Sequence, residues 1–278
     1  MIPLLPKPSA EQERLLETIR RKAWVKLSPR VEEAFLRNPR HFFVRTFSID
    51  HDHWFEVDGE TVFNYLPLIY SDATLLIWDK DDHVSTISQP SLVLHMLELL
   101  DLKAGMRVFE LGTGSGWNAA MLSCLVGSSG EVVSYEIVPE LAALAKKIVA
   151  EIGLANVRII EGDAAGLIRN EEAFDRGIFT AGAYDLPLSF FDKVKEGGKL
   201  LFVLKTGNGD ILLTLEKRKD HFEETNRMRC KFVPVMGELA PKPAVPFSEI
   251  PERVLIFPKG REAGRRILIS GATCSYVR

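Results

Sequence analysis

Short apolar runs alternate with stretches in which apolar residues recur at helical spacing over residues 107–217 of the chain. Runs of the first kind are typical of buried strands, and stretches of the second kind are typical of amphipathic helices. The predicted strands cover residues 107–111, 131–136, 157–161, 174–180, 199–205 and 211–217. The predicted helices cover residues 117–126, 140–152 and 186–195. This alternation predicts a parallel sheet with helices on both faces.

Other patterns flank this region. Gly207-Asn-Gly-Asp210 is a tight-turn sequence, so we expect the last strands of the sheet to run antiparallel as a hairpin. Nearer the N-terminus, Ser9 and Ser28 each precede a helical pattern of apolar residues and are candidate N-caps. The apolar residues of segment 50–70, which surround Asp58-Gly59, predict a further hairpin.

The first strand of the predicted sheet ends in a glycine motif, Arg107-Val-Phe-Glu-Leu-Gly-Thr-Gly-Ser-Gly-Trp117. Because glycine has no Cβ, the backbone can turn tightly there and approach a ligand closely. The amides at the start of the next helix are then free to donate hydrogen bonds. A dinucleotide fingerprint starting at Gly112 would need glycine at position 117, where this chain has Trp117, and would place no carboxylate just before the first glycine.

Glu110, the acidic residue of this motif, indicates the class of ligand. Its oxygens can accept a hydrogen bond, directly or through water, from the ammonium of a methionine moiety, which a nicotinamide cofactor lacks. The motif therefore predicts an S-adenosylmethionine (SAM) site. The candidate cofactor-binding residues of the motif are Glu110, Gly112, Thr113, Gly114, Ser115 and Gly116.

Residues at the ends of the other parallel strands are further candidates, because ligands in such sheets lie beyond the carboxyl ends of the strands. Glu136, 20 residues after Gly116, is predicted to accept hydrogen bonds from both ribose hydroxyls. Asp163 is predicted to accept from an adenine amino group, with Gly162 allowing close approach. The alternative is that both acids only cap the helices that follow them.

Composition narrows the class of protein. The chain has 278 residues, of which 46% are hydrophobic, and a formal net charge of −3, which argues against a general nucleic-acid binder. Its first residues lack a basic region followed by an apolar run, and no stretch reaches membrane-spanning length. Cysteines occur only at positions 124, 230 and 274, without metal-ligand spacing. We expect a cytoplasmic protein with no metal, nucleic-acid or membrane partner; the sequence leaves its oligomeric state open.

Five segments together resemble the protein-L-isoaspartate O-methyltransferase family over roughly residues 30–240, in order and in spacing. They are Thr86-Ile-Ser-Gln-Pro90, Val108-Phe-Glu-Leu-Gly-Thr-Gly-Ser-Gly116, Glu136-Ile-Val-Pro-Glu140, Phe174-Asp-Arg176 with Thr180-Ala181, and Phe232-Val-Pro-Val235. The resemblance implies a class I methyltransferase (Rossmann-like) fold, which is a doubly wound, mostly parallel seven-stranded sheet with an antiparallel terminal hairpin. It also implies SAM as methyl donor and an isoaspartyl peptide or protein as substrate, whose free carboxylate is esterified.

Ser88 is the catalytic candidate that the resemblance implies, since the serine of the Thr-Ile-Ser motif lies at the reacting centre in this family. Its hydroxyl would hold the substrate carboxylate in line with the methyl group. The residues alone favour Ser88 as an N-terminal cap, because Gln89-Pro90 and a helical pattern follow it; the resemblance reverses this preference, and the two roles do not exclude each other. The remaining candidate cofactor-binding residues are Ser85, Thr86, Ile137, Ala164 and Thr180.

One segment departs from the family. Residues 75–85 replace its short, glycine-containing lead with a longer loop that has neither glycine nor proline and that carries Asp79, Asp81, Asp82 and His83. This loop either reshapes the peptide groove or is a solvated acidic surface. The sequence therefore predicts a divergent member of the family. Its expected function is general repair of damaged proteins. The alternative is that it methylates one aspartate of one particular peptide, which then forms a succinimide.

The expected domains are an N-terminal region of helices and a hairpin (1–84), a SAM-binding core (85–240) and a C-terminal extension (241–278). Residues 252–278 hold six Lys or Arg against two Glu and predict a basic hairpin. This hairpin either docks an acidic peptide or completes a sheet edge. An alternative of another class is a SAM-binding adaptor without catalysis that uses this hairpin as its contact surface.

Overall fold

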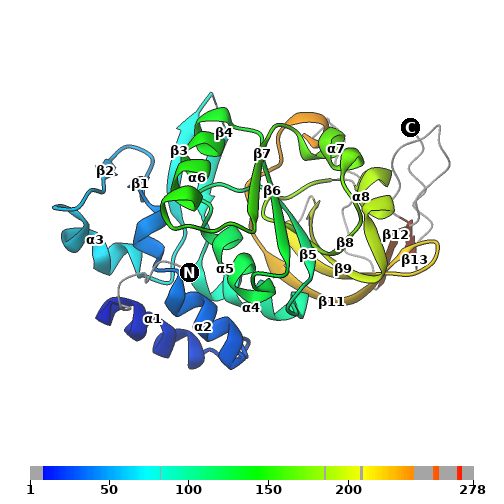
Figure 1. Ribbon diagram of the computed structural model, residues 1–278, viewed down its shortest axis with the longest axis horizontal. Coiled ribbons are helices and arrows are strands. Elements are labelled where there is room, and N and C mark those ends of the chain that lie inside the picture. Colours follow the sequence, from blue (N-terminus) through cyan, green and yellow to red (C-terminus); the bar gives the residue numbers. More distant parts are fainter. Residues whose placement is uncertain are drawn as a thin grey trace.

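A large twisted sheet forms the centre of the protein, and helices cover both of its faces (Figure 1). The computed structural model describes residues 9–240 other than 82, 185, 207 and 208, together with strands 253–256 and 268–270. The strands of the large sheet are β5 (Arg107–Leu111), β6 (Glu131–Glu136), β7 (Val157–Glu161), β8 (Phe174–Phe179), β9 (Val194–Thr206), β10 (Gly209–Lys217), β11 (Phe222–Cys230), β12 (Arg253–Ile256) and β13 (Leu268–Ser270).

The order of these strands is β13-β12-β11-β10-β9-β8-β5-β6-β7. Neighbours from β7 to β9 are parallel, and each pairing from β9 to β13 is antiparallel. The predicted class I methyltransferase fold is confirmed, including the hairpin of β9 and β10. Because β12 pairs with β11, the C-terminal extension lengthens the sheet edge, as one of its two interpretations predicted. The turn expected between β12 and β13 lies outside the described residues. So do the basic residues of the extension other than Arg253, which begins β12.

Alternation along the strands divides the core into two hydrophobic layers. Val108 and Val132 face the layer built by α4 (Pro90–Leu100), α5 (Trp117–Val126) and α6 (Pro139–Glu151). Phe109 and Val133 face the opposite layer, to which α8 (Leu188–Lys193) contributes. The short elements α7 (Ala164–Leu167), η2 (Ile168–Asn170) and η3 (Gly237–Leu239) complete this part of the chain. Helix α8 is shorter than predicted because β9 already begins at Val194.

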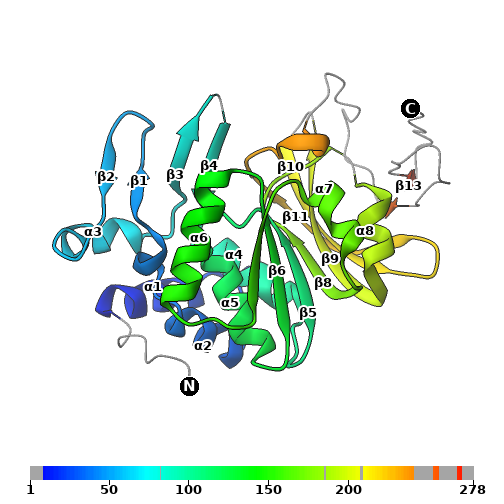
Figure 2. The ribbon, with the colours of Figure 1, turned by 45° about the horizontal axis from the view of Figure 1, so that its top comes forward.

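The N-terminal region contains its own sheet, which stands beside α6 and apart from the large sheet (Figure 2). Its elements are α1 (Ala10–Arg20), α2 (Pro29–Arg37), η1 (Arg40–Phe43), β1 (Thr46–Ser48), β2 (Trp54–Glu56), α3 (Val62–Ile69), β3 (Leu75–Lys80) and β4 (His83–Ile87). The strand order is β2-β1-β3-β4. Both predicted N-caps are confirmed, since Ser9 accepts from the Gln12 amide at 3.1 Å and Ser28 from the Val31 amide at 3.4 Å.

Two predictions for this region were wrong. The Asp58-Gly59 segment does not join two strands, because the Asp58 carboxylate accepts from the Glu60 and Thr61 amides, both at 2.8 Å, in a turn that leads into α3. The hairpin there is formed by β1 and β2 instead. Residues 75–85 are likewise strand rather than loop, since β3 and β4 pair antiparallel and Asp81 takes a left-handed conformation with φ 52° at the turn. The domain boundary expected between residues 84 and 85 falls inside β4.

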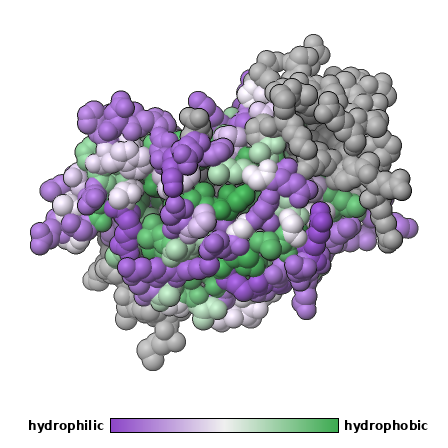
Figure 3. Space-filling model, turned by 90° about the horizontal axis from the view of Figure 1, so that it is seen from above, coloured by the Kyte–Doolittle hydropathy of each residue, from purple (hydrophilic) through white to green (hydrophobic). Residues whose placement is uncertain are grey.

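On the face of the molecule seen from above, hydrophobic residues near the centre are surrounded by hydrophilic ones (Figure 3). Within the described part of the chain, no helix combines the length and the apolar character needed to cross a membrane.

Candidate active site

A cavity opens at the carboxyl ends of the parallel strands β5, β6 and β7, where the sequence placed the ligand. The end of β4, the link to α4 and the segment 232–236 form its other walls. It brings together all but one of the candidate residues. Those that line it are Ser85, Thr86, Ser88, Glu110, Gly112, Thr113, Gly114, Ser115, Glu136, Ile137, Gly162, Asp163, Ala164 and Thr180.

Gly116 is the candidate that the cavity does not include. It is the N-cap of α5, and a Cβ built on it would lie 3.6 Å from the Cβ of Ala145 on α6. This glycine therefore lies at the contact between two helices, which a local motif cannot distinguish from a ligand contact. Both glycines have a positive φ, but Gly112 differs in its surroundings, because a Cβ there would lie only 2.4 Å from the Thr180 hydroxyl oxygen. That hydroxyl is held 2.9 Å from the Leu111 carbonyl oxygen and 2.6 Å from that of Gly112.

Glu110 is fully buried at the end of β5. One carboxylate oxygen accepts from the Asn118 side-chain amide at 2.7 Å, and the other accepts from the Ser134 hydroxyl at 2.5 Å. Burial raises the pKa of Glu110 to about 7, and the charge of Glu136 acts in the same direction. A cation bound in the cavity would reverse this effect and favour the ionised carboxylate.

Glu136 ends β6 and lies beside the glycine loop. One of its oxygens accepts from the Gly114 amide at 2.7 Å, and the other accepts from the Val138 amide at 3.0 Å. Val138 is the N-cap residue of α6, so the carboxylate both supports a helix start and lines the cavity. Burial raises the pKa of Glu136 above its ordinary value.

Asp163 also combines a local role with a place in the cavity. Its carboxylate caps α7 by accepting from the Ala165 amide at 2.9 Å, which is the capping interaction that the sequence left open. The other oxygen accepts from the Glu238 amide of η3 at 2.7 Å. Gly237 makes this contact possible, since a Cβ on it would lie 2.3 Å from that oxygen.

Ser88 lines the cavity and is not the cap of α4. The N-cap residue is Gln89, and its side chain makes no capping hydrogen bond to the helix. Asp72 supplies this interaction from a distant segment, because its carboxylate accepts from both the amide and the hydroxyl of Ser91 at 2.8 Å. The capping interpretation of Ser88 was therefore wrong, since the partner of the helix comes from elsewhere in the fold.

Residues 232–236 form a wall of the cavity that the sequence did not predict, although Phe232-Val-Pro-Val235 resembles the family. Phe232 is held by the ion pair of the half-buried Lys205 with the buried Asp210, in which Asp210 accepts from the Phe232 amide at 2.9 Å and Lys205 donates to the Phe232 carbonyl at 3.1 Å. The Phe-Val-Pro-Val motif was the available signal, but the segment follows an antiparallel strand and lies outside the strand-end rule used for the other candidates. Further lining residues that sequence reasoning missed include Val93, Met96, Asn118, Tyr135, Val138, Met236 and Leu239.

The electrostatics of the cavity fit a cationic ligand. Two buried carboxylates, Glu110 and Glu136, line it, and none of the described lining residues is Lys, Arg or His. A phosphate-bearing ligand would meet like charge without a basic partner, whereas SAM carries a sulfonium and an ammonium group. The fold and this site together define a SAM-dependent class I methyltransferase.

Comparison with known proteins specifies the family. The chain belongs to the protein-L-isoaspartate(D-aspartate) O-methyltransferase family, whose sequence profile matches residues 10–240. It is 35% identical over 230 residues to protein-L-isoaspartate O-methyltransferase of Pyrococcus horikoshii, covering 81% of this chain and 93% of that protein. Protein-L-isoaspartate O-methyltransferase 2 of Archaeoglobus fulgidus is 32% identical over 228 residues, covering 82% of this chain and 94% of that protein.

Two solved structures share this fold. A protein-L-isoaspartate O-methyltransferase structure superposes with a TM-score of 0.70 at 27% identity, covering 82% of this chain and 67% of that chain. The fold also matches a Plasmodium falciparum structure, described as a protein of this kind in complex with S-adenosyl-L-homocysteine, with a TM-score of 0.65 at 19% identity. That alignment covers 82% of this chain and 99% of that one.

Proposed function

We propose that the protein transfers the methyl group of SAM to the free carboxylate of L-isoaspartyl residues in peptides or proteins, and so initiates their repair. The observation that carries this proposal is the position of the Thr-Ile-Ser segment against the glycine loop. A Cβ on Gly114 would lie 3.8 Å from the main-chain oxygen of Thr86, and Ser88 lines the same cavity. Family membership over residues 10–240 supports the choice of substrate.

The residues divide the work by chemistry. SAM would supply an electrophilic methyl carbon on its sulfonium, so that a carboxylate oxygen forms the new O–C bond as the C–S bond breaks and S-adenosyl-L-homocysteine leaves. All three acids line the cavity, and we assign Glu110 to accept from the ammonium of the cofactor, Glu136 from the ribose hydroxyls, and Asp163, with its remaining acceptor capacity, from the adenine amino group. The isoaspartyl carboxylate is already ionised at neutral pH, so no strong general base is needed. Positioning of the reactants is then the main contribution of the protein.

Ser88 is the proposed catalytic residue. Its hydroxyl donates a hydrogen bond to one oxygen of the substrate carboxylate and leaves the other oxygen in line with the methyl group. Because the side chain does not cap α4, Ser88→Ala should leave thermal stability nearly unchanged. The rate of methyl transfer at saturating SAM should fall about tenfold or more, with about 1.4 kcal/mol of transition-state stabilisation lost for each factor of ten. Full activity of Ser88→Ala would remove this residue from the catalytic machinery.

The deciding experiment is a methyl-transfer assay on paired peptides that differ only in an isoaspartyl or an aspartyl residue. Turnover of the isoaspartyl peptide alone supports repair. Turnover of one particular aspartyl peptide would favour the dedicated modifier, for which the β3–β4 hairpin next to the cavity is the motivating feature. Binding of SAM without transfer to any peptide would favour an adaptor. We further propose that the protein has no nucleic-acid partner, which the net charge of −3 supports, and that it is cytoplasmic, which its three cysteines at distant positions support.

A further inference from the structure

We propose that Arg40 is a positioning residue that sets the place of Ser88, an inference that rests on the proposed function. Arg40 lies in η1 and its side chain is fully buried. Among the described residues, its guanidinium donates hydrogen bonds to main-chain carbonyl oxygens only. These belong to Ile69 at 2.7 Å, Ser71 at 3.3 Å, Ala73 at 2.9 Å, Ile87 at 3.0 Å and Ser88 at 2.9 Å.

This arrangement is a costly way to hold a fold together. Burial lowers the pKa of Arg40 to about 9, because the charged form has lost its hydration. Within the described part of the chain no carboxylate lies within ion-pair distance of it, although the more distant charge of Asp72 favours the cation. The Nε atom is buried without a hydrogen-bond partner. A buried cation that is only partly satisfied is a poor stabiliser, so a role in geometry accounts better for it.

The contacts of Arg40 restrict Ser88 directly. The guanidinium binds the carbonyl oxygens of two consecutive residues, Ile87 and Ser88, so the peptide units on both sides of the Ser88 Cα are held. Asp72 acts on the other side, where it accepts from the Gln89 side chain at 3.2 Å and from the Ser91 amide at 2.8 Å. Arg40 and Asp72 therefore bracket the turn that carries the serine into the cavity.

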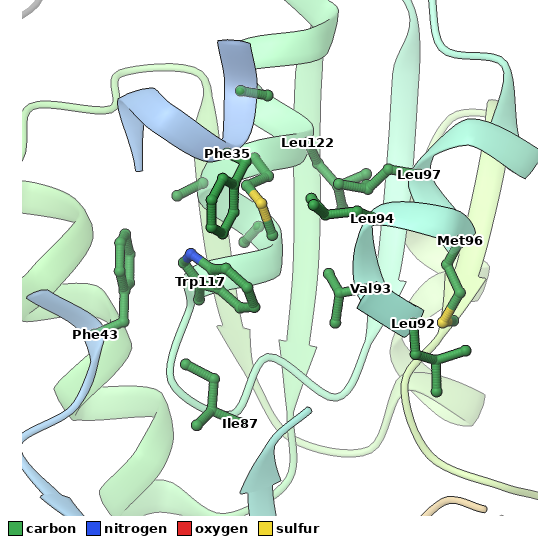
Figure 4. Close-up of a cluster of buried hydrophobic side chains, with 14 of the residues drawn as sticks. Phe35, Phe43, Ile87, Leu92, Val93, Leu94, Met96, Leu97, Trp117 and Leu122 are labelled. Carbon is green, nitrogen blue, oxygen red and sulfur yellow. The ribbon is translucent and has the colours of Figure 1, made fainter. Parts of the chain in front are cut away.

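Packing fixes the guanidinium itself. Its central carbon lies 5.4 Å from the centre of the Trp117 ring, and Trp117 donates from its indole nitrogen to the Asn38 carbonyl at 2.9 Å. Trp117 lines the cavity and lies among Phe35, Phe43 and Ile87 (Figure 4).

The planar fork of arginine presents five donors in fixed directions, whereas lysine offers a point charge with three donors. Arg40→Lys therefore cannot reproduce the hydrogen bonds to the carbonyl oxygens.

Arg176 is a matched control at the opposite end of α4. It is also buried, and its guanidinium donates to the main-chain carbonyls of Leu100 at 2.7 Å, Asp175 at 2.9 Å and Asp101 at 3.5 Å. It does not line the cavity. Arg176→Lys therefore reports what the loss of the same chemistry does to α4 without touching the serine turn.

The test compares Arg40→Lys and Arg176→Lys in the full chain by thermal unfolding, SAM binding, and kcat and KM on an isoaspartyl peptide. Both variants should lose stability. Only Arg40→Lys should lower kcat about tenfold or more, with SAM affinity within about twofold of wild type. Adding Ser88→Ala to Arg40→Lys should reduce kcat by less than it does in the wild type, because the serine is already displaced. Unchanged kcat, equal losses in both variants or fully multiplicative effects would overturn the proposal.

A second measurement does not depend on the substrate. The thiol introduced by Ser88→Cys is alkylated with iodoacetamide, and the modified peptide is followed by mass spectrometry. The rate of alkylation should change at least threefold when Arg40→Lys is added to Ser88→Cys and stay constant when Arg176→Lys is added. Equal rates in Ser88→Cys and in the two double variants would overturn the positioning role. Because this readout needs no methyl transfer, it distinguishes failure of the positioning role from failure of the proposed function. Arg40→Gln is the second variant if Arg40→Lys does not fold, and failure of both to fold beside a folded Arg176→Lys would assign Arg40 a purely structural role.

Discussion

Glu136→Gln tests whether the carboxylate at the end of β6 serves the fold, the cofactor or both. In the structure the carboxylate accepts from the Gly114 amide at 2.7 Å and from the Val138 amide at 3.0 Å, and the residue is buried. Glutamine keeps one acceptor oxygen and replaces the other with a donor. One of the two amides must then lose its partner, whichever way the side chain turns.

The magnitude follows from two opposing effects. An amide left buried without a partner costs about 1–3 kcal/mol. The neutral amide of glutamine avoids part of the burial cost that raises the pKa of Glu136, so we expect the free energy of unfolding to fall by about 1–2 kcal/mol at pH 7. Thermal unfolding should report this as a loss of about 2–4 °C for each kcal/mol.

The effect on the cofactor is separate. Loss of one ribose hydrogen bond to a charged group should weaken SAM binding by roughly 1–3 kcal/mol, which is about 5- to 150-fold in Kd by calorimetry. Glu161→Gln is the control, since Glu161 pairs with Glu136 in register at the end of β7 but is exposed. It should change stability by less than about 0.5 kcal/mol and leave SAM affinity intact. Reduced stability with wild-type SAM affinity in Glu136→Gln would refute the ribose assignment and leave Glu136 with a structural role alone.

Three further predictions concern neighbouring groups. Gly112→Ala should weaken SAM binding and lower the melting temperature, because its Cβ would lie 2.4 Å from the Thr180 hydroxyl oxygen; a variant as stable as wild type would contradict this. Since the pKa of Glu110 is raised to about 7 from its ordinary 4.5, this residue's contribution to stability is present below pH 4.5 and is lost as the pH rises to about 7. Glu110→Gln should therefore gain on wild type by about 2–3 kcal/mol in denaturant unfolding between pH 5 and pH 8, and a constant difference would show that the buried carboxyl titrates normally. Asp210→Ala removes the ionic partner of Lys205, whose side chain is 15% exposed, and the acceptor of the Phe232 amide; it should cost about 1–3 kcal/mol in the same assay, with a loss below 1 kcal/mol counting against the clamp on the wall of the site.

The sequence alone determined the elements whose causes are local. Strands β5, β6 and β7 begin and end where the apolar runs predicted, and so does α5. The glycine loop and the acids that end the strands were found for the same reason, since a missing Cβ and a carboxylate after a buried strand are properties of neighbouring residues. The location of the cavity then followed from the parallel order of the strands.

Only the tertiary structure decided the interactions whose partners are distant in the chain. Ser88 does not cap α4 because Asp72 does so from an earlier segment, and Gly116 contacts α6 and does not line the cavity. Residues 75–85 form a hairpin, in which β3 also pairs with β1, although their acidic composition favoured a loop. Arg40 carried no local signal at all, since its partners are carbonyl oxygens of residues 69–88. Periodicity and spacing describe the neighbours of a residue along the chain, whereas burial and hydrogen bonding depend on which segments the fold brings together.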